Sequence, residues 1–288
     1  MLNIDYVITD KILLNALRED TGNGDVTTSA LIPEKHVSDA VIIAKGDFIL
    51  AGLPFVERIF KLIDSNIKFR AVKKDGSRIK AKTIIAKISG NTGNLLMAER
   101  TALNLLQRLS GIATLTDKYV QSVKDLKVKI TDTRKTAPGL RFFDKYAVRT
   151  GGGCNHRYGL FDGVLIKDNH IAAIGGVGKA VKLARAKVHH LFNIEVEVKN
   201  IPEVKEALSA GANVIMLDNI NVDMMKRAVS IIRRKNPDVL IEASGNVTFE
   251  NVRSIAATGV DLISIGALTH SAPAADVSMK IGNHSVIG

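Results

Sequence analysis

The sequence predicts an α/β protein in which an N-terminal α+β domain of the α/β sandwich type precedes an incomplete TIM-like α/β barrel. After residue 110, apolar strand-like runs alternate with helical patterns, and the last four runs end about 20 to 26 residues apart. Connections of that length require crossover helices between parallel strands. Before residue 110, short strands and helices follow one another without this rhythm. A doubly wound sheet is the alternative architecture for the second part.

The first part of the chain mixes both kinds of element. Apolar residues at helical spacing predict a helix over residues 8–19, and turn-forming residues predict a loop over 19–33. The run LPFVERIFKLID predicts a helix between two pairs of strands, and Asp75-Gly76 marks a turn. Runs rich in β-branched residues predict these strands at 39–45, 48–52, 66–73 and 83–89.

A long helical pattern covers residues 94–123, with Ala102, Leu105 and Leu109 on one apolar face. Arg100 lies on a polar stripe of the same pattern. Such a stripe is usually solvated, but it is also a place from which a second subunit's site could borrow a cation.

Six strand candidates and three helices make up the predicted barrel. The helices are 202–211, 222–235 and 249–259, and the strands are 127–133, 163–168, 193–198, 213–218, 239–244 and 261–266. We therefore expect an N-terminal domain at 1–110 and a barrel domain at 111–270. The tail at 271–288 is long enough to pack back on the first domain.

The composition is that of a globular protein with a basic surface. The 288 residues are 46% hydrophobic, and 40 Lys and Arg against 29 Asp and Glu give a formal charge of +11. This charge implies nucleic acid, an anionic membrane or a polyanionic substrate as partner. Binding of single-stranded nucleic acid uses aromatic platforms, and the chain has no Trp and 4 Tyr. We expect a small polyanionic substrate rather than nucleic acid or a membrane.

The cysteine count and the hydropathy pattern bear on location. A single cysteine, Cys154, excludes an intramolecular disulfide and a cysteine metal cluster, which fits a reducing compartment. No run approaches the ~18 apolar residues of a membrane span. The first twenty residues carry acids and no long apolar run, unlike a signal peptide. We expect a cytoplasmic protein.

Residues 132–170 form the stretch with the densest functional chemistry. It holds His156, His170 and three consecutive glycines, and its basic residues are Arg134, Lys135, Arg141, Lys145, Arg149, Arg157 and Lys167. The stretch begins and ends in strand-like runs, so its charges lie where buried strands emerge. Parallel α/β folds carry their chemistry at such strand ends. This pattern predicts a cationic site.

Polar residues follow the other predicted strands as well. Small residues in the SGN and IGA turns let backbone N–H groups approach a phosphate, and Glu197 and Asp218 offer hard oxygens to Mg²⁺ or to ribose hydroxyls. Glu195 shares a strand face with Glu197, so either can be that ligand. Together these strand ends predict a site for a phosphorylated sugar and a second, carboxylate-bearing substrate. The turns are Ser244, Gly245 and Asn246, and Ile265, Gly266 and Ala267.

Several motifs in this order resemble the quinolinate phosphoribosyltransferase family, also called nicotinate-nucleotide pyrophosphorylases. They are EDTGNGDVTT, ERTALNLLQRLSGIAT, DTRKTAPGLR, KYAVRTGGGCNHRYGLFDGVLIKDNH, EVEV, IMLDN, EASGNVTFENV and GVDLISIGALTHS, and the resemblance covers about residues 8 to 280. It implies that quinolinate and phosphoribosyl pyrophosphate give nicotinate mononucleotide, pyrophosphate and carbon dioxide, with Mg²⁺, in NAD synthesis. It also implies a homodimer with sites between subunits. Whether dimers assemble into hexamers stays open.

The resemblance implies a role for each matching residue. Thr133, Arg134, Lys135, His156, Arg157 and Lys167 would line the quinolinate pocket, and Arg100 would reach it from the neighbouring subunit. Glu197 and Asp218 would hold Mg²⁺ and the ribose hydroxyls. Phosphates would lie in the turns Ser244 to Asn246 and Ile265 to Ala267. The catalytic set would be Lys135, Lys167, Glu197 and Asp218. Cys154 stands where the family more often has Lys.

Two alternative functions are also consistent with parts of the sequence. A phosphoribosyltransferase-like protein associated with molybdate transport is similar in fold, but the intact NHR at 155–157 followed by LIKDNH favours the quinolinate enzyme. A basic nucleic-acid-binding protein is the rival from a different class, motivated by the positive charge.

Overall fold

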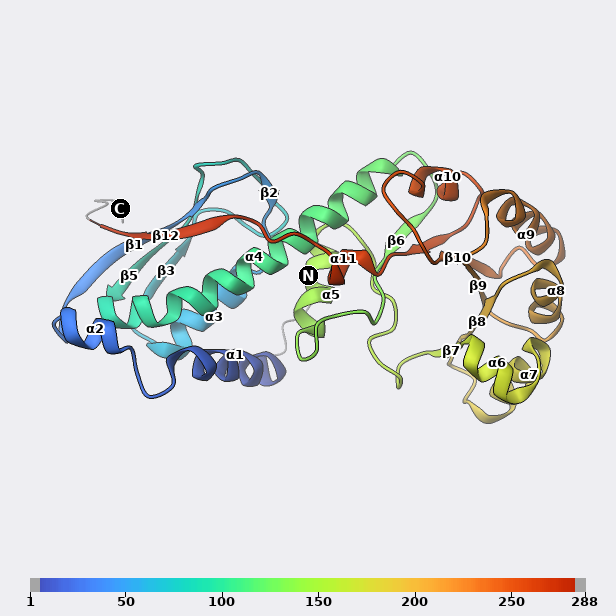
Figure 1. Cartoon of the computed structure of the whole chain (residues 1–288), viewed down its shortest axis with the longest axis horizontal. Coiled ribbons are helices and arrows are strands. Elements are labelled where there is room, and N and C mark those ends of the chain that lie inside the picture. Colours follow the sequence, from blue (N-terminus) through green and yellow to red (C-terminus); the bar gives the residue numbers. More distant parts are fainter. Residues whose placement is uncertain (1–5, 283–288) are drawn as a thin grey trace. The chain divides into compact units, whose positions relative to one another are not determined.

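The structure, a computed structural model, describes residues 6–282 as two compact units (Figure 1). The first unit contains residues 6–117, 136–152 and 269–282, and the second contains 118–135 and 153–268. The predicted α/β class is confirmed, with an antiparallel sheet in the first unit and a parallel sheet in the second. None of the helices within residues 6–282 combines the length and hydropathy needed to cross a membrane.

The first unit is built on an antiparallel sheet of four strands. Their order is β12 (Val277–Ile281), β1 (Val37–Ala44), β5 (Ile84–Asn91) and β3 (Lys68–Ala71). The carboxyl-terminal segment therefore supplies an edge strand to the sheet that begins near the amino terminus (Figure 1). A separate pair joins β2 (Phe48–Ile49) to β4 (Arg78–Ile79). The helices of this unit are α1 (Tyr6–Thr21), α2 (Val26–Leu31), α3 (Leu53–Ile63), α5 (Arg141–Thr150) and most of α4 (Thr92–Ser122).

One expected loop of this unit contains a helix. The segment 19–33, rich in turn formers, includes the six-residue helix α2. Asp25 begins it, because its carboxylate accepts a hydrogen bond from the backbone N–H of Thr28 at 2.9 Å. The prediction of a continuous loop over 19–33 was therefore wrong. Asp is common both in turns and at helix N-caps, and here Asp25 caps a helix.

The second unit is built on a parallel sheet of six strands. All six predicted barrel strands are present, as β6 (Lys129–Thr131), β7 (Val164–Ile166), β8 (Ile194–Val198), β9 (Val214–Asp218), β10 (Leu240–Ser244) and β11 (Leu262–Ser264). The connecting helices are α6 (Asp168–Ile174), α7 (Val177–Lys187), α8 (Ile201–Ser209), α9 (Val222–Lys235) and α10 (Val252–Ala256). The short α11 (Ala267–His270) follows β11.

The strand order shows where this barrel stays incomplete, because β6 and β7 are the two ends of the sheet. Strands β7 to β11 are neighbours in chain order, and β11 pairs in parallel with β6, the first strand. On the other edge of β6, Cys154 forms a single parallel bridge with Thr131. Residues 153–156 thus lie beside β6, where a complete barrel would have another strand. They pair with β6 through this one bridge only.

The division of the chain differs from a simple cut at residue 110. Helix α4 (Thr92–Ser122) is continuous through that position, and residues 136–152 join the first unit. The physical reason is packing: the ring of Phe143 in α5 meets that of Phe55 in α3 edge-on, with centroids 4.9 Å apart, and both rings are fully buried.

An ion pair ties the same segment to α4. Asp144 is fully buried, and its two carboxylate oxygens accept hydrogen bonds from Nε and Nη2 of Arg108, each at 2.8 Å. We expect Asp144→Ala to destabilise the protein by about 3 kcal/mol in urea unfolding followed by circular dichroism, because it leaves a partly buried charge without its partner. Asp125→Ala is the control. Asp125 also holds a forked pair, with Arg253, but over half of each side chain is exposed. Equal losses in both variants would contradict the prediction.

Candidate active site

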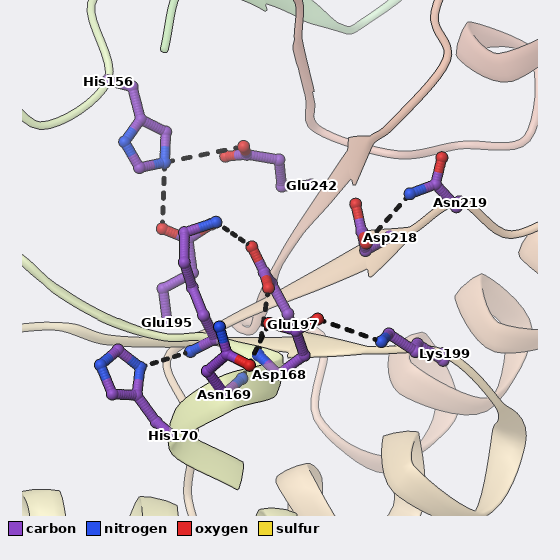
Figure 2. Close-up of polar contacts among 11 residues, drawn as sticks. His156, Asp168, Asn169, His170, Glu195, Glu197, Lys199, Asp218, Asn219 and Glu242 are labelled. Carbon is purple, nitrogen blue, oxygen red and sulfur yellow. Dashed lines mark hydrogen bonds and ion pairs between the residues drawn. The ribbon is translucent and has the colours of Figure 1, made fainter. Parts of the chain in front are cut away.

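Polar side chains gather at the carboxyl ends of the parallel strands (Figure 2). Glu197 of β8 and Glu242 of β10 lie level with each other, because both pair with Met216 of the intervening β9. One step further along, Asp218 pairs with Ser244. The register therefore brings the predicted strand-end residues of three strands to one edge of the sheet, where the ligand sites of parallel α/β folds lie.

The segment 155–157 is fixed to the end of β6 by a buried carboxylate. Asp132 is fully buried, and its Oδ1 accepts a hydrogen bond from the backbone N–H of His156 at 2.8 Å. Its Oδ2 accepts one from Nδ2 of Asn155 at 2.6 Å. Asp132 thus holds the main chain of His156 and the side chain of Asn155. The residues after His156 therefore leave β6 in a defined direction.

Two arginines lie close together in this site. Burial lowers the pKa of Arg157, and the positive charge of Arg134 lowers it further. Nη1 of Arg157 donates a hydrogen bond to the carbonyl of Gly163 at 2.9 Å, which holds the guanidinium in place. Neighbouring guanidinium groups repel each other until an anion lies between them. Their planar forks match a carboxylate or a phosphate.

The half-buried ring of His156 meets two buried glutamates in this site. Nε2 of His156 is 3.1 Å from Oε2 of Glu195 and 3.6 Å from Oε1 of Glu242 (Figure 2). Burial and the neighbouring Glu195 carboxylate raise the pKa of Glu242, whose side chain is 1% exposed. Sequence analysis left Glu195 and Glu197 as equivalent candidates. The structure separates them, because Glu195 faces His156.

Glu197 faces Lys167 instead. The Nζ of Lys167 forms an ion pair with Oε1 of Glu197, and Oε2 of Glu197 lies 3.4 Å from the backbone N–H of Asp168. The N–H of Lys167 itself donates to Nδ1 of His170 at 2.9 Å. The start of α6 is thus fastened at the end of β7 by contacts with Glu197 and His170 (Figure 2).

A network of amides links the ends of β9 and β10. Nδ2 of Asn219 donates to Oδ2 of Asp218 at 3.1 Å, and Oδ1 of Asn219 accepts from Nδ2 of Asn246 at 3.0 Å. Asn219 and Asn246 both have left-handed backbones, with φ of 54° and 47°. Gly245, with φ of 89°, has no room for a side chain, because a Cβ there would lie 2.2 Å from Oδ1 of Asn219. The SGN turn is therefore held tightly against Asp218.

The remaining predicted residues are placed as follows. Thr133 and Lys135 lie just after β6, where Oγ1 of Thr133 accepts a hydrogen bond from the N–H of Lys135 at 3.0 Å. The second small turn, of Ile265, Gly266 and Ala267, leads from β11 into α11, and its first N–H donates to the carbonyl of Thr131 at 2.9 Å. Arg100 is an exposed residue of α4 in the first unit, outside the unit that holds this site.

Sequence analysis did not single out Glu242. It lies in β10 between Ile241 and Ala243, and the run VLIEAS was interpreted only as a strand. The sequence signal that could have identified Glu242 is its single charge within an otherwise apolar strand, because a buried carboxyl group requires a partner.

The donor set was also tested for a metal ion. Glu197 and Asp218 are carboxylates at the ends of neighbouring strands. Mg²⁺ typically binds one or two protein carboxylates together with substrate oxygens and water. The carboxylates present fit that ion, with Lys167 already offsetting part of the charge of Glu197.

Two family models match the chain. The model of the quinolinate phosphoribosyl transferase C-terminal domain matches residues 112–280, and that of the N-terminal domain matches residues 25–110. Together they cover most of both compact units and every predicted site residue.

Curated relatives and solved structures agree with these matches. A probable nicotinate-nucleotide pyrophosphorylase (carboxylating) of Synechocystis sp. is 47% identical, over 96% of this chain and 93% of the relative. One from Bacillus subtilis is 44% identical, over 98% and 97%. The crystal structure of NadC from Streptococcus pyogenes is 40% identical with a TM-score of 0.93, covering 98% of this chain and 99% of that one. By these similarities, which span both units, the chain belongs to the quinolinate phosphoribosyltransferase family.

Proposed function

We propose that the protein is a decarboxylating quinolinate phosphoribosyltransferase. It would convert quinolinate and phosphoribosyl pyrophosphate to nicotinate mononucleotide, pyrophosphate and carbon dioxide, in NAD biosynthesis. The observation that carries the proposal is the pair of guanidinium groups, Arg134 and Arg157, which share one unit with the carboxylates and small turns at the strand ends, Arg157 lying within the electrostatic influence of Arg134. Quinolinate carries two carboxylates, and a pair of forked cations is complementary to them.

The cationic side of the site is assigned to quinolinate. Arg134 and Arg157 would bind its carboxylates, with Thr133, Lys135, His156 and Lys167 lining the same pocket. The proximity of two positive charges supports this, because a dianion relieves their repulsion.

The opposite side is assigned to phosphoribosyl pyrophosphate. The turns of Ser244, Gly245 and Asn246, and of Ile265, Gly266 and Ala267, would hold its phosphates through backbone N–H groups. The closeness of Gly245 to Asn219 supports this, because small residues let backbone approach a ligand. Glu197 and Asp218 would hold Mg²⁺ and the ribose hydroxyls, and the ion would supply positive charge where pyrophosphate departs.

Positioning and charge account for the chemistry. The pyridine nitrogen of quinolinate is itself the nucleophile, so the protein needs to orient the ring against the sugar carbon rather than provide a nucleophile. Bond formation makes that nitrogen cationic, which stabilises the carbanion left when the adjacent carboxylate departs as carbon dioxide. Lys135 and Lys167 would stabilise the developing negative charge electrostatically.

The assembly and location are part of the proposal. We propose a homodimer in which Arg100 of one subunit reaches the other subunit's quinolinate pocket; a hexamer of such dimers is the alternative assembly. The exposure of Arg100 on α4 supports its availability to a second copy. The single cysteine supports a reducing compartment such as the cytoplasm.

The direct test is turnover. The protein mixed with quinolinate, phosphoribosyl pyrophosphate and Mg²⁺ is expected to release nicotinate mononucleotide and carbon dioxide, both followed by chromatography and isotope release. Nicotinate in place of quinolinate is the control and is expected to give no product, because it lacks the second carboxylate. If neither quinolinate nor nicotinate gives a product, the proposal is refuted and the molybdate-associated relative is favoured.

A second prediction concerns the arginine pair. Arg134→Ala and Arg157→Ala should each lower kcat/KM for quinolinate at least about a hundredfold, because a charged hydrogen-bond partner of the substrate is lost. The thermal midpoint should stay nearly unchanged. Arg227→Ala, on the exposed surface of α9, is the matched control and should keep full activity. Full activity of either pocket variant would remove that arginine from the pocket.

A third prediction concerns the turn at the end of β10. Gly245→Ala should raise the KM for phosphoribosyl pyrophosphate about tenfold or more, because the new methyl collides with the Asn219 amide and moves the turn. Gly211→Ala is the control: it has a similar φ, 81°, but nothing lies within 4 Å of its added Cβ. Steady-state kinetics measure both. Equal effects would mean that backbone strain alone, and not the turn's position, is responsible.

A further inference from the structure

Both ring nitrogens of His156 have partners inside the protein. Nδ1 accepts a hydrogen bond from the backbone N–H of Arg157 at 2.8 Å, and Nε2 lies 3.1 Å from Oε2 of Glu195. The side chain is 13% exposed. A ring held on both sides in this way is suited to orienting its neighbours.

The geometry also decides where the ring proton lies. An N–H group points at Nδ1, so Nδ1 is the acceptor and the proton is on Nε2. Nε2 therefore donates to Glu195. Glu242 stands on the other side of the same nitrogen, with Oε1 at 3.6 Å, too long for a hydrogen bond but close enough to limit the ring's rotation.

The three side chains also have the composition of a metal site, since one ligand atom from each lies within 4.8 Å of the others. The protonated Nε2 argues against that role. A histidine ligand must present an unprotonated nitrogen to a metal, and here the unprotonated nitrogen faces the main chain of Arg157. The cluster is better described as a hydrogen-bonded support.

Three hydrogen bonds connect His156 and Arg157 to their surroundings. The His156 ring orders the N–H of Arg157, and the main chain of His156 is fastened by Asp132. At its far end, Arg157 is held by the carbonyl of Gly163. The His156 ring therefore fixes the main chain from which the Arg157 side chain extends, and the two glutamates lie against that ring.

We propose that Glu242 is a positioning residue which, with Glu195, holds the His156 ring in the orientation that orders Arg157 for binding a quinolinate carboxylate. This inference rests on the proposed function. It assigns to Glu242 a part in quinolinate recognition, although its buried side chain lies behind His156. Burial and Glu195 favour the protonated form of Glu242 by raising its pKa.

Two substitutions separate positioning from stability. Glu242→Met keeps the length of the side chain and removes its polar end. Replacing a buried ionisable group by an apolar one of similar size is often neutral or stabilising, so we expect an unchanged or higher thermal midpoint. We nevertheless expect the KM for quinolinate to rise about tenfold, as when an outer partner of a binding residue is lost. Glu242→Gln keeps the shape and hydrogen-bonding capacity of a protonated carboxyl and should stay within about threefold of wild type.

The experiment is a double-mutant cycle on the full-length protein. Steady-state KM values for quinolinate and for phosphoribosyl pyrophosphate are measured in wild type, Glu242→Met, His156→Ala and the double variant. If Glu242 acts through His156, Glu242→Met changes the KM for quinolinate by less than about twofold once His156 is absent. The KM for phosphoribosyl pyrophosphate should stay within about twofold throughout.

Each other outcome overturns the role. An unchanged KM for quinolinate in Glu242→Met, an equal effect in the His156→Ala background, equal losses for both substrates, or equal losses in the Met and Gln variants would each exclude positioning through His156. Failure of the wild type to turn over quinolinate would overturn the proposed function and this role together. The wild-type reaction therefore distinguishes the two failures.

Discussion

In the second unit, three glutamate side chains are buried within parallel strands, and each needs a compensating group. Glu197 has Lys167, while Glu195 and Glu242 face His156. Buried charges are costly unless they are paired. Lys167 and His156 already serve as partners of these glutamates, and Arg134 and Arg157 are the cations that we propose for a ligand. The charges of Glu195 and Glu197 also raise the pKa of Arg157, which opposes the effect of Arg134. Repulsion between the guanidinium groups is thereby tolerated without a bound anion.

The incomplete barrel and the site share one segment of chain. A complete barrel would place a regular strand beyond β6, and residues 153–156 provide a single bridge there. Because the following residues are not committed to a strand, Asp132 can hold the main chain of His156 and direct Arg157 toward the strand ends. The irregular segment beside β6 is therefore the feature that positions Arg157, the cation that we propose for quinolinate.

At the other side of the site, rigidity comes from the backbone. Asn219 and Asn246 adopt left-handed conformations that cost energy for residues with a side chain, and their amides hold each other and Asp218. A turn constrained in this way offers its N–H groups in one arrangement. Preorganised donors do not have to be ordered when a phosphate binds, so more of the interaction energy appears as affinity.

Local patterns were enough for the six barrel strands, for the long helix α4 and for the strand-end residues of the site, because strand and helix periods and the polar residues after each strand are properties of short segments. The motifs were also enough for the family, since they recur in order along the chain. They were not enough for the helix α2, where the same Asp25 signals a turn or a cap. Nor did they decide which glutamate faces which cation, how deeply Glu242 is buried, or that α5 packs with the first unit. Those depend on the register between strands and on contacts between residues far apart in sequence, and only the folded chain brings such groups within reach of each other.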